Sequence, residues 1–130
     1  MQVERAKRLV PKATFIRGDM AAVNFRPASF IAVVAFYAII HVPLPEQPAL
    51  FRRIAGWLRP GGVFMGIVGK TPWTGVEEDW LGVKGGTMYW SHEGEDAYLR
   101  WLAEAGLSVE WTRFIPEGTG GHVLLLATRA

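Results

Sequence analysis

The strongest constraint on the fold is a run of apolar residues from Phe30 to Val42 that contains almost no polar side chain. The run is rich in Val, Ile and aromatic residues, and it is too short and too interrupted to span a bilayer. Strands that are buried on both faces have this composition, because helices cover both sides of the sheet. The sequence therefore predicts a central strand at 30–36 with both faces covered.

A helix and a second apolar strand follow this run. Apolar residues at helical spacing from Leu50 to Leu58 predict the helix, and Pro60-Gly61-Gly62 ends it. Val63 to Val68 then reads as a second buried strand. A strand, a crossover helix and a strand form the parallel unit of α/β folds, in which ligands bind at the carboxyl ends of the strands. A site is therefore expected between Tyr37 and His41.

The other segments complete a single predicted domain over residues 1–130. The pattern predicts a helix at 3–10, a short strand at 13–17, a last helix at 97–105, and two antiparallel strands at 107–114 and 122–128. The stretch 69–92 has no clear period and is rich in Gly and aromatic residues. Long loops in compact domains are usually functional. We therefore expect a lid-like loop there, with a short helical piece near 76–81.

Composition excludes several classes of function. Half of the 130 residues are hydrophobic, which indicates a globular protein, and the absence of cysteine excludes disulfides and thiol nucleophiles. The net charge of +2 is too small to indicate a nucleic-acid partner. Lys and Arg concentrate in the first 60 residues, where solvated helix faces are a better explanation than an anionic ligand. Without a signal peptide, a cytoplasmic location is expected.

Several short segments resemble one enzyme family in their order and spacing. They are Gln2–Arg8, Ala13–Met20, Ser29–Pro43, Trp57–Gly62, Glu78–Gly82 and Met88–His92. Together they resemble the class I S-adenosylmethionine-dependent methyltransferases, especially the small-molecule enzymes of the methyltransferase type 11 kind. The resemblance implies an α/β, truncated Rossmann-like methyltransferase fold. Its sheet would be mostly parallel with a C-terminal antiparallel hairpin. The implied cofactor is S-adenosyl-L-methionine, and the implied reaction is methyl transfer to a small molecule.

The sequence also departs from this family. The family fold begins with a strand and a glycine-rich loop around the cofactor, then a helix and a second strand that ends in an acid for the ribose hydroxyls. No such pattern occurs here, and Ile31 stands where the family often has Asp. This chain alone is therefore expected to bind the cofactor poorly and to be weak or inactive unless the missing half is supplied. The alternative is a non-catalytic module for dimerisation or partner binding.

The missing segments also leave one strand without its usual neighbour. In the family, the strand that corresponds to 30–36 lies beside the first strand of the fold. An apolar strand with an unpaired edge promotes association. We expect either that the 13–17 strand pairs directly with the 30–36 strand, or that two chains repair the edge as a homodimer or swapped dimer.

The resemblance assigns candidate cofactor residues to the ends of two strands. Asp19 would accept a hydrogen bond from the adenine amino group, and Met20 would pack on the ring. The alternative for Asp19 is a turn residue that caps backbone N–H groups. Ala35, Phe36 and Tyr37 would lie beside the methionine part of the cofactor, and their alternative is core packing.

A catalytic residue and a substrate pocket can also be named. His41 could act as a general base or orient a substrate hydroxyl, although a lone histidine after a strand is more often structural. Four residues could line a substrate pocket or simply cover the core, namely Trp80, Tyr89, Trp90 and His92. The histidines and the acids at 77–79 lack metal-ligand spacing, so no metal site is predicted. Neither a nucleic acid nor a membrane is expected as a partner.

Overall fold

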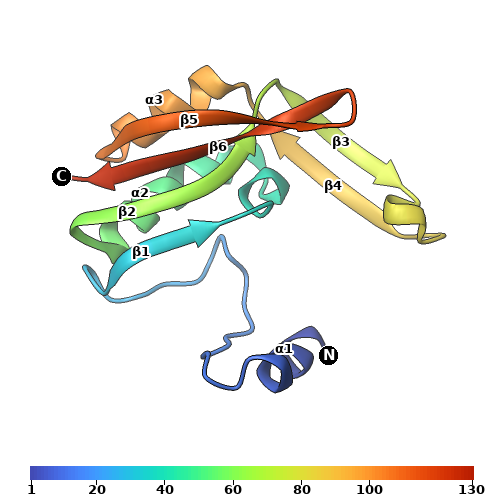
Figure 1. Cartoon of the computed structure of the whole chain (residues 1–130), viewed down its shortest axis with the longest axis horizontal. Helices are drawn as coiled ribbons and strands as arrows, with labels where there is room; N and C mark the ends of the chain where they lie inside the picture. Colours follow the sequence, from blue (N-terminus) through green and yellow to red (C-terminus); the bar gives the residue numbers. More distant parts are fainter.

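The computed structural model describes residues 1–130 as a four-stranded sheet with two helices on one face and a projecting two-stranded arm (Figure 1). The sheet contains, in spatial order, β1 (Phe30–Ala35), β2 (Leu58–Gly69), β6 (Gly120–Arg129) and β5 (Leu107–Glu117). The helices are α1 (Gln2–Leu9), α2 (Gln47–Trp57) and α3 (Glu95–Glu104), and the arm consists of β3 (Trp73–Glu78) and β4 (Thr87–His92). Short 3-10 turns occupy Ile39–His41, Leu44–Glu46 and Trp80–Gly82.

The strands of the sheet run in mixed directions. β1 pairs in parallel with β2, while β6 lies antiparallel to both β2 and β5. Three strands therefore share one direction, but only one of the three pairings is parallel. Because parallel strands need a crossover connection, α2 joins β1 to β2, whereas a tight turn with Gly118 at φ +58° joins β5 to β6. The predicted α/β class is confirmed, with most strands of the sheet in one direction and an antiparallel hairpin at the C-terminal end.

The hydrophobic core lies between the sheet and the pair of helices α2 and α3. Alternate residues of β6, namely Val123, Leu125 and Ala127, are buried, as expected when successive side chains point to opposite faces. They belong to a cluster of 16 buried residues that includes Phe51 of α2 and Tyr98 of α3. Burial of this apolar surface is the main stabilising term for the fold.

β1 is much less covered than its sequence predicts. Ile31 is 71% exposed and Val34 is 58% exposed, and no residue of β1 is buried. The strand lies at the edge of the sheet and pairs only with β2, so neighbouring elements cover little of it. The apolar run correctly predicts a strand, but burial on both faces is wrong.

The segment before β1 contains no strand. Residues 13–17, which were predicted as a strand, are irregular, and the chain from α1 to Phe30 follows a loop below the sheet (Figure 1). A strand forms only where a neighbour accepts its backbone hydrogen bonds, and β1 does not pair with this segment. Repair of the edge within the chain is therefore wrong. The predicted helix at the start is confirmed as α1, which has no buried residue, and no helix is long and apolar enough to cross a membrane.

Residues 69–92 form a β-hairpin arm instead of the predicted lid-like loop. β3 and β4 pair antiparallel from Trp73 opposite His92 to Glu78 opposite Thr87. The predicted helical piece is reduced to the 3-10 turn at the tip. Asp79 closes this tip by accepting the Gly85 N–H at 2.7 Å, with Asp79 itself at φ +52°. A hairpin is easiest to recognise in a sequence when a two-residue turn joins its strands. Here the turn-forming residues are spread along a longer tip, so the sequence does not indicate a hairpin.

A buried amide joins the arm to the rest of the fold. Gln47 is fully buried at the start of α2, and its Nε2 donates to the carbonyl oxygens of Val42 and Ser91, each at 2.6 Å. Its Oε1 accepts the Tyr98 hydroxyl at 2.8 Å. One side chain therefore connects α2, α3, the turn after β1 and strand β4.

Replacement of Gln47 by Leu should destabilise the protein strongly. Two buried carbonyls and one buried hydroxyl lose their partner, so we expect a loss of about 3 kcal/mol in the free energy of unfolding. Urea denaturation followed by circular dichroism measures this change. The matched control is Gln2→Leu on exposed α1, for which we expect a change within about 0.5 kcal/mol. Equal effects of the two variants would contradict a structural role for the Gln47 amide.

Association through β1 remains a prediction. Its open edge and exposed apolar side chains favour pairing with a second copy of the chain. Sedimentation velocity should show a homodimer that the edge substitution Val34→Lys weakens by at least about tenfold in dissociation constant, since a lysine on the edge opposes strand pairing. Val76→Lys on the exposed arm is the control and should leave the association unchanged. A wild-type protein that stays monomeric at high concentration would rule out this prediction.

Candidate functional site

A pocket of about 430 Å³ lies at the carboxyl end of β1. One wall is the loop that carries Asp19 and Met20, and the other is the turn from Ala38 to Glu46, which carries His41. The pocket thus brings together three of the predicted site residues from two separate segments. Two carboxylates, a thioether and an imidazole line it, which makes it suitable for a polar ligand with a planar ring.

The Asp19 loop is tied to α2. Asp19 Oδ1 accepts the backbone N–H of Ala21 at 2.9 Å, and the guanidinium of Arg53 donates to the Ala21 carbonyl. Farther along, the ring of Phe25 packs edge-on against Trp57, with ring centres 5.0 Å apart. These contacts hold the loop in place without a strand at 13–17. The turn role of Asp19 and a ligand role are compatible, because Oδ1 makes the turn bond and Oδ2 has no protein partner.

His41 connects this pocket to the arm. Its Nδ1 lies 2.7 Å from the carbonyl oxygen of Tyr89, and its ring centre lies 4.7 Å from that of Trp90. A carbonyl can only accept, so Nδ1 carries the hydrogen and Nε2 of the neutral ring is left as an acceptor. The arm therefore fixes both the orientation and the tautomer of His41.

Aromatic side chains gather around Trp90 at the base of the arm. The ring centres of Trp80, Trp73 and His92 lie 5.2, 5.9 and 6.5 Å from it, respectively. The predicted residues Trp80, Trp90 and His92 are thus brought together. The side chain of Tyr89 is 41% exposed, while its carbonyl oxygen is the group that holds His41.

Two polar residues that the sequence did not single out complete the cluster. The hydroxyl of Tyr37 donates to Glu117 Oε1, and Nδ1 of His122 lies 2.8 Å from Glu117 Oε2. The His122 ring stacks on Trp90 at 5.8 Å. Tyr37 and Glu117 are 80 positions apart, and only the pairing of β5 with β6 brings Glu117 and His122 together. No local sequence signal reveals this contact.

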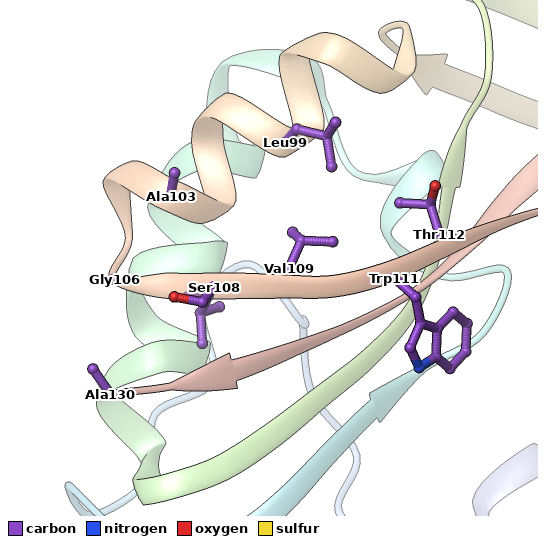
Figure 2. A pocket seen from close by; sticks show the side chains of 9 residues that line it. Leu99, Ala103, Gly106, Ser108, Val109, Trp111, Thr112 and Ala130 are labelled. Atoms are coloured by element: carbon purple, nitrogen blue, oxygen red, sulfur yellow. The ribbon is translucent and has the colours of Figure 1, made fainter.

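A second pocket, of about 620 Å³, lies between α3 and β5 (Figure 2). Leu99 and Ala103 of α3 and Val109 of β5 line it, and no ionisable side chain does. It sits at the end of the β5–β6 hairpin opposite to Glu117 and His122. The polar pocket at the end of β1 is therefore the better candidate for chemistry.

Comparison with protein families and solved structures agrees with the fold. Residues 1–62 match the methyltransferase domain family. The solved S-adenosylmethionine-dependent methyltransferase from Mesorhizobium loti superimposes with a TM-score of 0.74 at 21% identity, covering 97% of this chain and 74% of that chain. The first part of the chain is therefore similar to the methyltransferase domain family, and the whole chain has the fold of solved S-adenosylmethionine-dependent methyltransferases. The predicted resemblance is confirmed.

Other similar proteins are matched over only part of their length. Sterol 24-C-methyltransferases from Clavispora lusitaniae and Candida albicans are 39% and 38% identical over 69 residues, which is 48% of this chain. The match spans only 18% of the length of these curated relatives. The Burkholderia thailandensis 1,6-didemethyltoxoflavin-N1-methyltransferase, solved with S-adenosylhomocysteine, has a TM-score of 0.73 at 15% identity and is covered over 56% of its length.

The residues predicted to lie beside the methionine part of the cofactor are close to the pocket but do not line it. Ala35 ends β1 and packs against the core, whereas Phe36 is half exposed. Tyr37 turns the chain with φ +48°, which is rare for a residue that is not glycine. The pocket itself fits an adenosyl group, because Asp19 Oδ2 is free to accept from an amino group and Met20 offers an apolar face.

Neighbouring groups shift several pKa values. Burial raises the pKa of Glu117, but the hydrogen bonds from Tyr37 and His122 outweigh this effect and leave it lowered. The hydrogen bond to Glu117 raises the pKa of Tyr37. Burial lowers the pKa of His92, which the Thr71 carbonyl partly opposes and the nearby His122 and His41 reinforce. At neutral pH the carboxylate is therefore ionised and the phenol is neutral.

Acid should lower the stability of the fold through protonation of His92. Its pKa in the fold lies below the ordinary value of 6.5, so the unfolded chain binds more protons, and stability falls as the pH drops below that value. Urea unfolding at about pH 7.5 and about pH 5.5 should show this loss, with a smaller loss for His92→Gln. The interval between about pH 8 and about pH 9 is the control, since His92 is neutral there in both states. If the variant lost as much unfolding free energy between about pH 7.5 and about pH 5.5 as the wild type, groups other than His92 would be responsible for the loss.

Proposed function

We propose that this chain serves the transfer of a methyl group from S-adenosyl-L-methionine to a small molecule. The observation that carries the proposal is the pocket at the carboxyl end of β1, where the Asp19 loop and the His41 turn meet. Ligands of open α/β sheets bind at this end of the strands. The match of residues 1–62 to the methyltransferase domain family supports the same function.

The cofactor, when bound, supplies a methyl group on a positively charged sulfur. In the proposed arrangement Asp19 accepts a hydrogen bond from the adenine amino group and Met20 packs on the ring. Ala35, Phe36 and Tyr37 then flank the methionine part at the end of β1. Solved relatives hold S-adenosylmethionine or its demethylated product, which supports this choice of cofactor.

His41 is the proposed base or orienting group. The Tyr89 carbonyl holds its Nδ1–H, so Nε2 presents a lone pair. An unshared Nε2 can accept a proton from a hydroxyl or amino group of the methyl acceptor, or orient that group by a hydrogen bond. Alignment of the acceptor with the methyl group would supply most of the rate.

The proposed acceptor site is the aromatic base of the arm. Trp80, Tyr89, Trp90 and His92 offer apolar faces with polar edges, which suit a small, largely apolar molecule. The sterol 24-C-methyltransferases named above act, by name, on a sterol, which supports a small apolar acceptor as the substrate class. The chain lacks a glycine-rich loop and an acid for the ribose, so we expect it to bind the cofactor weakly by itself.

Titration with S-adenosylhomocysteine tests the cofactor site. In ¹⁵N-labelled protein, the amides of residues 18–21 and 41–42 should shift, with a dissociation constant of about 0.1 to 1 mM. Asp19→Ala should weaken binding about tenfold, because one hydrogen bond to a charged group is lost. Glu104→Ala, an exposed acid at the end of α3, is the matched control and should bind like the wild type.

Two results would contradict parts of this proposal. If the amides around Asp19 and His41 do not move at saturating ligand, the pocket is not the cofactor site. Binding tighter than about 10 µM by the unmodified chain would instead contradict weak binding and show that the glycine-rich loop is dispensable.

A further inference from the structure

Tyr37 has an unusually fixed position for a side chain that is 44% exposed. Its hydroxyl donates to Glu117 Oε1, and its ring meets the edge of the His122 ring at 5.7 Å and 78°. Its backbone is held at φ +48°, a conformation that costs energy for a residue with a Cβ. Such strain persists only where the surrounding structure imposes it. The side chain of Tyr37 is held in turn by its contacts with Glu117 and His122.

Glu117 is itself held on both oxygens. Oε1 accepts from Tyr37, and Oε2 accepts from Nδ1 of His122 at 2.8 Å. The His122 ring is largely buried and stacks on Trp90 with an interplanar angle of 25°, so it is held on its other side as well. We call Tyr37, Glu117 and His122 the tyrosine latch. It joins the end of β1 to the β5–β6 hairpin.

The latch determines which hydrogen bonds Tyr37 can still make. A phenol has one proton to donate and lone pairs to accept with. The carboxylate of Glu117 can only accept, so it takes the single Tyr37 proton. The exposed oxygen of Tyr37 is therefore left as an acceptor, and it can pair only with a ligand group that brings its own hydrogen.

We propose that Tyr37, held by Glu117 and His122, recognises the hydroxyl or amino group of the methyl acceptor by accepting a hydrogen bond from it. This inference rests on the proposed function, because it assumes that the acceptor enters beside the end of β1. It narrows the substrate class to small molecules that carry O–H or N–H at the reacting position. Glu117 and His122 are positioning residues, and Tyr37 is the residue that contacts the substrate.

Phenol and anisole form a matched pair of probes for the complete chain. They share one ring, but only phenol can donate a hydrogen bond from its oxygen. We expect phenol to shift the amides of residues 36–38 in ¹⁵N-labelled protein and to bind about fivefold tighter than anisole, the value of one hydrogen bond of about 1 kcal/mol. Aniline and N,N-dimethylaniline repeat the comparison for an N–H donor.

Variants separate recognition from folding. Tyr37→Phe should reduce the phenol-to-anisole ratio to about one, because the accepting oxygen is gone. Glu117→Ala frees the Tyr37 hydroxyl to donate its proton to the oxygen of anisole. The phenol-to-anisole affinity ratio should therefore fall because anisole binds more tightly. Glu110→Ala, an exposed acid on the same strand, should keep the wild-type ratio. Retained amide dispersion in each spectrum shows that the variant is folded.

The inference is overturned if wild-type protein binds phenol and anisole equally, if neither probe shifts residues 36–38, or if Tyr37→Phe keeps the preference for phenol. These probes are added without cofactor, and they report on different amides from the S-adenosylhomocysteine titration. A failed cofactor site and a failed tyrosine latch therefore give different spectra.

Discussion

The buried amide of Gln47 sets the relative positions of the parts of the candidate site. The amide nitrogen of Gln47 donates to the carbonyl of Val42, the residue after His41, and to the carbonyl of Ser91, the residue after Trp90. The amide oxygen of Gln47 accepts a hydrogen bond from the Tyr98 hydroxyl. A buried amide without partners is costly, so each of these bonds constrains the segment that supplies it. The arm and the turn after β1 are thus fixed to one helix, and the contact between His41 and Trp90 follows.

The sequence predicts those elements whose stabilising contacts are local or repeat regularly along the chain. Helices α2 and α3, strand β2 and the β5–β6 hairpin follow from apolar periodicity, glycine turns and proline positions. Residues 13–17 fail as a strand because β propensity needs a neighbouring strand, which composition does not report. The arm was missed for a different reason. Asp79 and Gly85 close a long tip, and neither β3 nor β4 shows a regular alternation of buried and exposed residues.

Some residues of the candidate site could likewise be predicted from the sequence and others could not. His41 could be named in advance because it follows the carboxyl end of a recognisable strand. Asp19 and Met20 could be named from the family resemblance, although the strand expected before them is absent. Glu117 and His122 could not be named, since their contact with Tyr37 depends on the register of β6 against β5 and on one residue with positive φ. Register is set by side-chain packing over the whole sheet, and it is not written in any short motif.

The hydrogen bonds within the candidate site leave it rich in acceptor groups. The Nδ1–H of His41 is committed to the Tyr89 carbonyl and the hydroxyl proton of Tyr37 to Glu117, so both side chains present only lone pairs. Asp19 adds a carboxylate oxygen without a protein partner, and the Trp90 cluster adds aromatic faces. Lone pairs, a carboxylate and π faces all attract hydrogen-bond donors and positive charge. That character suits the two groups that the proposed methyl transfer would bring together, a nucleophile with its proton and a sulfur that carries positive charge.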